Sequence, residues 1–376
     1  MTLMLSIVTG LPPRIDGIGD YALSLARRVR EDIGIETRFV VGDPAWSGPP
    51  RVAGFEVDKL AERSRAGLLR FLREGAKDAR AVLLHYGGYG YATRGCPSWL
   101  IDGLRQWRGE TGDRFLITMF HELYAFGPPW TSAFWLSPLQ RNLAARLARL
   151  SDQYLTSRHR YAEAVSRWSL GKHNSVRSLP VFSSVGEPDC VRPLIDRSRR
   201  LVIFGTPGRR IQVYRRSAED LDRICRHLGV EEILDIGRPI NLDFARTLRT
   251  PVVVRGELSG DDVSRSLSDA IAGVLDYPAE ILGKSTIFAA YCAHRAVPVI
   301  AAYGKASRAD GLEPDTHYWL SDVGPEKLSL AAGQAIADNA YNWYQGHNLS
   351  THAKTLAACL AANGHFINGG ASDARV

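Results

Sequence analysis

One segment near the C-terminus limits the possible folds more than any other, because it alternates apolar runs with a loop and a helix. Residues 271–275 form an apolar run that ends at a Tyr-Pro turn, and a short loop then leads to a helix of small residues over 286–294. A second apolar run covers residues 297–301. This order predicts a strand–helix–strand unit with two parallel strands, and therefore an α/β fold.

The loop of this unit has the properties of an anion site. It carries Lys284, Ser285 and Thr286 where the predicted helix begins. Free backbone N–H groups and the helix dipole favour a negative charge at a helix N-terminus, and Lys284 adds a full positive charge. The loop is not a nucleoside-triphosphatase P-loop, because that motif requires a glycine five residues before Gly283, and position 278 is a proline. The pattern therefore predicts a phosphate-binding loop of another kind.

The N-terminal segment also leads from a strand into a helix. Residues 3–8 are continuously apolar, as in a strand that is buried on both faces of a parallel sheet. The loop that follows contains Gly17 and Gly19, which permit close approach of a ligand to the backbone, and Asp20 is expected to cap a helix over 21–29. The third glycine of a dinucleotide-binding fingerprint is missing, so a plain strand-to-helix turn stays an alternative.

Polar and aromatic side chains follow two further predicted strands, at 81–84 and 115–120. The residues expected to face a ligand are His85, Tyr86 and Tyr89 after the first strand, and His121 and Glu122 after the second. Ligands of open α/β sheets bind beyond the carboxyl ends of the strands. Tyrosines stack on sugars or lie against lipid headgroups, and a histidine beside a carboxylate can exchange protons with a substrate. Core positions for the tyrosines and a structural role for the histidines remain open alternatives.

The second half of the chain contains a second basic loop after a strand. Residues 201–204 are apolar, and two glycines and then Arg209 and Arg210 follow them. Arginines beside a glycine-rich turn form a suitable clamp for a phosphate, although an ordinary solvated loop would have the same composition. A linker rich in Pro, Ser and Gly over 181–193 marks the expected domain boundary.

Periodicity predicts the remaining elements. Helices are expected at 60–76, 134–150, 160–168, 220–228, 263–270, 328–344 and 349–361, and strands at 37–41, 153–156, 176–180, 233–236 and 252–255.

Composition narrows the class of protein. The 376 residues, 45% of them hydrophobic, suffice for two domains with real cores. The net charge of +7 comes mostly from arginine, which suits an anionic ligand, but no basic run is interleaved with aromatics, so nucleic-acid binding is not expected. Five well-separated cysteines fit a reducing compartment and argue against disulfides or a zinc site. Neither a signal peptide nor a membrane-spanning run is expected.

Together these patterns resemble a GT-B glycosyltransferase, which has two Rossmann-like domains facing a cleft. The resemblance covers nearly the whole chain, and its carriers are the segments 12–22, 120–124, 204–210 and the helix that ends before 296–300. It is similar to bacterial glycosyltransferases of the glycogen synthase-like superfamily. The resemblance implies an N-terminal acceptor domain over 1–182 and a donor domain over 194–345. It also implies a helix over 346–362 that returns to the first domain, and the tail over 363–376 is expected to be disordered.

The same resemblance implies where a nucleotide-sugar would bind. Its diphosphate would be held by Arg209 or Arg210 and by the loop around Lys284 and Ser285, while the loop from Gly17 to Gly19 would approach the phosphates and the acceptor. The chain departs from the family at one point. Tyr291, or Ala290 with one gap, stands where the family has a glutamate that holds the ribose, and Lys284-Ser285 stand where it has glycines. Glu280 is the only nearby acid that could replace the family's first glutamate.

The leading hypothesis is therefore a hexosyltransferase-type enzyme of polysaccharide biosynthesis that needs no metal and no cofactor. Its partners would be a nucleotide-sugar donor and a glycan or lipid-linked acceptor. The protein would be cytoplasmic, with peripheral contact to the inner face of the membrane left open. Retention or inversion is not decided; His121, Glu122 and Asp16 are the candidate bases. The alternatives are a catalytically inactive protein of the same fold, suggested by the missing glutamate, and a nucleotide-sugar epimerase.

Overall fold

The structure is a computed structural model that describes residues 3–76, 80–172, 178–243, 248–301, 308–321 and 328–362, without the side chains of 216 and 217. It divides into two compact units, Met1–Leu179 with Leu349–Val376 and Pro180–Asn348. The division falls at the start of the linker predicted over 181–193. The tail over 363–376 and residues 176 and 177 of the strand predicted at 176–180 lie outside the described residues. In the described part of that range, residues 178–180, Ser178 forms only an isolated parallel bridge to Thr156 instead of a strand.

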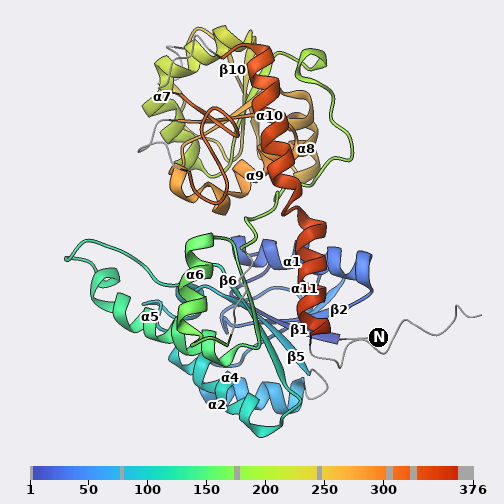
Figure 1. Ribbon diagram of the computed structural model, residues 1–376, viewed down its shortest axis with the longest axis vertical. Helices are drawn as coiled ribbons and strands as arrows, with labels where there is room; N and C mark the ends of the chain where they lie inside the picture. Colours follow the sequence, from blue (N-terminus) through green and yellow to red (C-terminus); the bar gives the residue numbers. More distant parts are fainter. Residues whose placement is uncertain are drawn as a thin grey trace, which may run out of the picture. The chain divides into compact units, whose positions relative to one another are not determined.

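The first unit is a parallel sheet covered by helices (Figure 1). Its elements are β1 (Leu3–Val8), α1 (Gly17–Ile33), β2 (Glu36–Val41), β3 (Arg51–Val52), β4 (Phe55–Lys59), α2 (Arg65–Arg70), η1 (Phe71–Gly75), β5 (Ala81–Tyr86), α3 (Gly88–Tyr91), α4 (Ser98–Glu110), β6 (Phe115–Phe120), α5 (Ser132–Leu150), β7 (Gln153–Thr156), α6 (His159–Trp168) and α11 (Leu349–Ala361).

The strand order of this sheet within the described residues is β3-β4-β2-β1-β5-β6-β7, and only β3 runs antiparallel to its neighbour. In the sheet, β2 is the neighbour of β1 on one side and β5 is its neighbour on the other side. This reversal of the order between β1 and β5 opens a crevice at the carboxyl ends of the two strands.

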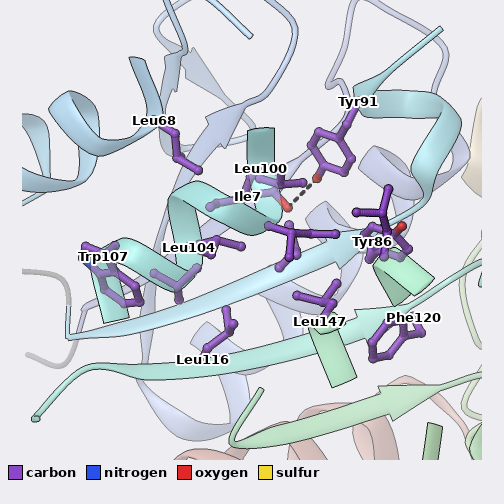
Figure 2. Packing of buried hydrophobic residues seen from close by; sticks show 14 of the residues in the cluster. Ile7, Leu68, Tyr86, Tyr91, Leu100, Leu104, Trp107, Leu116, Phe120 and Leu147 are labelled. Atoms are coloured by element: carbon purple, nitrogen blue, oxygen red, sulfur yellow. Dashed lines mark hydrogen bonds between the residues drawn. The ribbon is translucent and has the colours of Figure 1, made fainter. Parts of the chain in front are cut away.

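The core of the first unit joins strands and helices that are distant in sequence (Figure 2). Leu100, Leu104 and Trp107 bring α4 onto the sheet, and Tyr91 donates a hydrogen bond from its hydroxyl to the carbonyl of Ile7 at 3.1 Å. Helix α4 was not predicted, although these three residues have the i, i+4, i+7 spacing of an amphipathic helix. The short strands β3 and β4 were missed as well.

The last helix, α11, belongs to the first unit and lies beside α1 (Figure 1). Tyr21 of α1 and His352 of α11 are both buried, and the tyrosine hydroxyl lies 2.8 Å from the His352 Nδ1 atom. The Ser350 hydroxyl donates to the Asp32 carboxylate at 3.0 Å. The C-terminal helix is therefore bound to the N-terminal one by polar contacts as well as by packing.

The second unit is also a parallel sheet with helices on its faces. Its elements are η2 (Leu194–Asp196), β8 (Arg200–Phe204), α7 (Pro207–Leu228), β9 (Glu232–Ile236), β10 (Val252–Gly256), α8 (Gly260–Asp269), β11 (Ala272–Leu275), η4 (Ala279–Lys284), α9 (Thr286–Ala293), β12 (Val297–Ile300), β13 (Trp319–Leu320) and α10 (Leu330–Gln345). The order β10-β9-β8-β11-β12-β13, parallel throughout the described strands, reverses between β8 and β11.

The helix predicted at 60–76 begins only at Arg65 and consists of α2 and η1. Two other helix starts that differ from the prediction affect the site. Helix α1 begins four residues before the predicted start, because Asp16 rather than Asp20 caps it by accepting hydrogen bonds from the backbone N–H groups of Ile18 and Gly19. Helix α7 begins at Pro207, thirteen residues before the predicted start. Arg209 therefore lies in the first turn of a helix and not in a loop.

Substitution of the two glycines at the start of α1 tests how closely the backbone packs at this turn. A Cβ atom on Gly19 would lie 2.1 Å from the carbonyl oxygen of Gly10, whereas one on Gly17 would meet nothing within 4 Å. We expect Gly19→Ala to destabilise the first unit by about 1–3 kcal/mol through overpacking. Gly17→Ala, the matched control, should be neutral or stabilising by up to about 1 kcal/mol. Urea unfolding of the full chain measures both, and equal midpoints would contradict the close packing.

Candidate functional site

The second unit contains a cavity of about 250 Å³ at the reversal point of its sheet. Its walls come from the carboxyl ends of β8 and β11 and from the first turns of α7 and α9. Phe204 ends the first strand, and Asp276 and Tyr277 follow the second. Two adjacent parallel strands therefore lead into helices whose N-termini both border one cavity, an arrangement that favours an anion.

Arg209 is the exposed cation on the α7 side of this cavity. Its guanidinium lies 4.9 Å from the ring centroid of Tyr277 and donates a hydrogen bond to the carbonyl of Asp276 at 3.3 Å. Stacking on the ring holds the guanidinium at the cavity and leaves its remaining N–H groups for a ligand.

Arg210, the next residue, has a different environment. Its side chain is completely buried and forms a bidentate ion pair with Asp235, whose carboxylate also accepts a hydrogen bond from the Tyr214 hydroxyl at 3.0 Å. The third guanidinium nitrogen donates to the carbonyl of Arg238 at 2.8 Å. Arg210 touches the cavity wall, but its charge is matched inside the unit, so the structure gives it the geometry of a structural ion pair.

The α9 side supplies Lys284, Ser285 and Thr286, all of which line the cavity. Ser285 caps the helix by accepting a hydrogen bond from the N–H of Phe288 at 3.1 Å, and its hydroxyl proton remains available for an anion. Gly283 behind it is closely packed, since a Cβ there would lie 2.9 Å from a carboxylate oxygen of Asp310. Glu280 is exposed and is not part of the cavity wall.

Tyr291, the residue in place of the expected ribose-binding glutamate, lies in the core. Its hydroxyl donates to the carbonyls of Val202 and Val274 at 3.2 and 3.0 Å. Its ring fills the space above Gly273, where a Cβ would lie 2.2 Å from a ring carbon. Burial raises the pKa of this phenol far above its usual value. Position 291 thus ties α9 to β8 and β11.

The reversal point of the first sheet gathers several predicted residues. Asp16, besides capping α1, accepts a hydrogen bond from the Thr9 hydroxyl at 2.8 Å, so both of its oxygens are engaged. Gly17 and Gly19 form the first turn of α1 and belong to this unit, not to the one with the cavity.

His85 and His121, each at the end of a strand, form a buried pair there. The Nδ1 atom of His85 lies 3.0 Å from the Nε2 atom of His121, and the ring of Tyr21 packs edge-on against His121 at 4.9 Å. Complete burial lowers the pKa of His85 to about 3, so its imidazole is neutral and one nitrogen of the pair donates to the other.

The remaining predicted residues separate by exposure. Tyr86 is fully buried in the core cluster, with its ring in edge contact with Phe120. Tyr89 is 44% exposed, and its hydroxyl accepts a hydrogen bond from the Gln140 amide at 3.3 Å. Glu122 is exposed at the end of β6. Of the three acceptor candidates, Tyr89 alone presents a ring to solvent.

The two-unit architecture was compared with known proteins. No protein-family model matches the chain, and a search of curated proteins finds no match. Among solved structures it is similar to the apo form of WaaB, a lipopolysaccharide outer core galactosyltransferase, with 11% identity, 96% of this chain and 99% of the other covered, and a TM-score of 0.53. It is also similar to TarM, with 10% identity, 96% of this chain and 98% of the other covered, and a TM-score of 0.61. A third similar structure is S. aureus MnaA in a co-structure with UDP, with 12% identity, 100% of both chains covered and a TM-score of 0.53.

The fold is that of the GT-B glycosyltransferases. Two α/β units with mainly parallel sheets, matched over nearly the full length of both chains, confirm the fold class and the resemblance stated for the sequence. At these identities the comparison establishes the fold and leaves the activity to the site.

Three polar residues of the cavity wall, Thr206, Asp276 and Tyr277, were not among the predicted site residues. The available signal was the position of Asp276 and Tyr277 at the end of a predicted strand, the same argument that selected His85 and His121. Within the described ranges, no group of three or more His, Cys, Asp or Glu side chains is placed to hold a metal ion.

Substitution of the two adjacent arginines should affect the free energy of unfolding very differently. Arg210→Ala leaves a buried carboxylate unpaired and should lower the free energy of unfolding by about 3–5 kcal/mol. Arg209→Ala removes an exposed side chain and should stay within about 0.5 kcal/mol of the parent. Differential scanning calorimetry of both variants decides, and a stable Arg210→Ala protein would rule out the structural role.

The buried His85 predicts a pH dependence. Its folded pKa of about 3 lies below the unfolded value of about 6.5, so the unfolded chain binds more protons between these values. Stability should therefore be full above about pH 6.5 and fall as the pH drops. Between pH 7 and pH 5, the free energy of unfolding of the parent should fall by about 1–2 kcal/mol more than that of His85→Asn, as measured by urea titration at each pH. Parallel pH profiles for both proteins would contradict a neutral buried imidazole.

Proposed function

We propose that this protein is a glycosyltransferase that moves a hexosyl group from a nucleotide-sugar diphosphate to an acceptor hydroxyl. The supporting observation is the cavity of the second unit, where two helix N-termini, Arg209 and Lys284 surround one space. A diphosphate leaving group gains negative charge in the transition state, and such fixed donors stabilise it by about 3–4 kcal/mol each. Cations from the chain would do this without a metal ion.

The donor's polar groups would be divided among the cavity residues. The diphosphate would bind the first turns of α7 and α9, with the Arg209 guanidinium and Lys284 ammonium on its oxygens and the hydroxyls of Ser285 and Thr286 as further donors. The half-buried ring of Tyr277, in the cavity wall, would pack against the base or the sugar. Because Tyr291 is a core residue, the ribose would have to be held by groups other than a helix glutamate.

The acceptor, a glycan or a lipid-linked sugar in our proposal, would be activated by the first unit. Glu122 is exposed, and His121 lies with His85 at the reversal point of the sheet. Asp16 is a weaker candidate base, because its oxygens already accept three hydrogen bonds. None of the five cysteines forms a disulfide, which suits a reducing cytoplasm. Polysaccharide biosynthesis there is part of the same proposal.

A binding protein without turnover is the second candidate. It is favoured by one observation, the burial of Tyr291 where the family holds the ribose. A nucleotide-sugar epimerase of the same fold would instead convert the donor without an acceptor. Product analysis separates the three, because transfer needs the acceptor, epimerisation needs the donor alone, and a binder yields no product from either mixture.

Two substitutions test the donor site. Arg209→Ala and Lys284→Ala should each weaken binding of a nucleoside diphosphate about tenfold, equivalent to about 1.4 kcal/mol. Isothermal titration with UDP, ADP and GDP also identifies the base. Arg265→Ala serves as the control, because this exposed arginine pairs only with its helix neighbour Asp262 among the contacts described and lies outside the cavity. Unchanged affinity in both cavity variants would rule out this donor site.

A further inference from the structure

The first unit carries a group of large apolar side chains on its surface, in one segment of chain. Its members, which we call the aromatic edge, are Phe126, Trp130, Phe134, Trp135 and Leu139. The exposed fractions of Phe126, Trp130 and Trp135 are 80%, 85% and 71%. Single exposed apolar residues are normal in proteins, but five within fourteen residues mark an interaction surface.

Helix α5 explains why these side chains are not in the core. The residues that it buries all lie from position 140 onward and are Gln140, Leu143, Ala144, Leu147 and Ala148. None of the residues from Ser132 to Leu139 is buried, although this part of the helix is largely apolar. Figure 1 shows α5 at the border of the first unit, with its N-terminal end and the preceding loop extending away from the sheet.

The aromatic edge is held in place without being covered. The Trp135 indole N–H donates to the carbonyl of Pro129 at 2.7 Å, and the rings of Phe134 and Trp135 pack edge to face at 5.3 Å. Thr131 caps the helix with its side-chain oxygen. The apolar surface is thus ordered before anything binds it, which lowers the entropy cost of association.

The chain segment that carries this edge, and the segment that follows it, are mainly basic. No Asp or Glu occurs from residue 123 to residue 151, whereas Arg141, Arg146 and Arg149 lie on α5. From residue 123 to residue 172 the chain has seven basic and two acidic residues, a net +5 of the +7 of the whole protein. Arg141 and Arg149 are exposed, while Arg146 pairs with Asp102.

We propose that the aromatic edge docks on an anionic lipid bilayer, with Trp130 and Trp135 in the interfacial layer and the arginines of α5 and α6 on the headgroups. Tryptophan prefers the level of the headgroups, and an amphipathic helix with basic residues binds in the plane of the interface. Basic residues near such a surface strengthen the binding through attraction to the anionic headgroups. Among the described residues, no helix combines the length and the apolar character needed to cross a bilayer.

This surface replaces the site suggested by the sequence for a lipid contact. Of the tyrosines that the sequence suggested for a lipid contact, Tyr86 is fully buried and Tyr89 is 44% exposed, much less than Phe126, Trp130 or Trp135. The docking surface does not depend on the proposed transferase activity, since it lies in the unit without the donor cavity.

Vesicle sedimentation with the full-length protein tests the docking. Binding should be strong to vesicles of phosphatidylcholine with 30% phosphatidylglycerol and at least tenfold weaker to phosphatidylcholine alone. Phe126→Ser with Trp130→Ser should reduce binding about tenfold or more, and Arg141→Glu with Arg149→Glu should remove the preference for the anionic vesicles. Ile195→Ser is the matched control, because Ile195 is 61% exposed in the other unit and should not affect binding.

Three results would overturn the proposal. They are absence of binding to the anionic vesicles, equal binding to neutral and anionic vesicles, and unchanged binding of the Phe126/Trp130 variant. Sedimentation velocity without lipid addresses the other occupant of such a surface: a dimer that the same double substitution dissociates would assign the aromatic edge to a second copy of the chain. Thermal melting and UDP titration of each variant confirm that the fold and the donor site are intact.

Discussion

The packing of parallel strands governs the site. Parallel neighbours cannot be joined by a tight turn, so each strand is followed by a loop and a helix that crosses a face of the sheet. Where the strand order reverses, at β8 and β11, consecutive helices lie on opposite faces and the loops diverge. The cavity forms at that point, and its charge comes from the helix N-termini that the crossovers place there.

Buried polar contacts support this geometry from behind. The Arg210–Asp235 pair joins the first turn of α7 to β9, and the Tyr291 hydroxyl joins α9 to β8 and β11. Both helices that offer N–H groups to the cavity are therefore tied to the sheet through buried side chains. Such support holds the first turns that carry the proposed donor site in a fixed position.

In the proposed transfer reaction each unit would contribute different groups. The second contains the cationic cavity, and the first contains the buried histidine pair and the exposed aromatic edge. A transferase with a lipid-linked acceptor would gain from a membrane contact on its acceptor unit, because the acceptor would then be delivered in two dimensions. The arginines of this chain therefore have different roles. Arg209 borders the cavity, Arg210 forms a core ion pair, and three further arginines lie on α5, the helix that carries part of the aromatic edge.

The sequence alone determined the order of most elements and most strand positions, because mainly apolar runs such as 3–8 and 115–120 are typical of buried parallel strands. From that order followed the α/β fold class and the segments that border the cavity of the second unit. Only the tertiary structure decided which side chains are available there. Arg209 and Arg210, or Tyr86 and Tyr89, look equivalent in a sequence. A helix turns by about 100° per residue and a strand alternates its faces, so neighbours meet solvent or core according to packing partners that are distant in the chain.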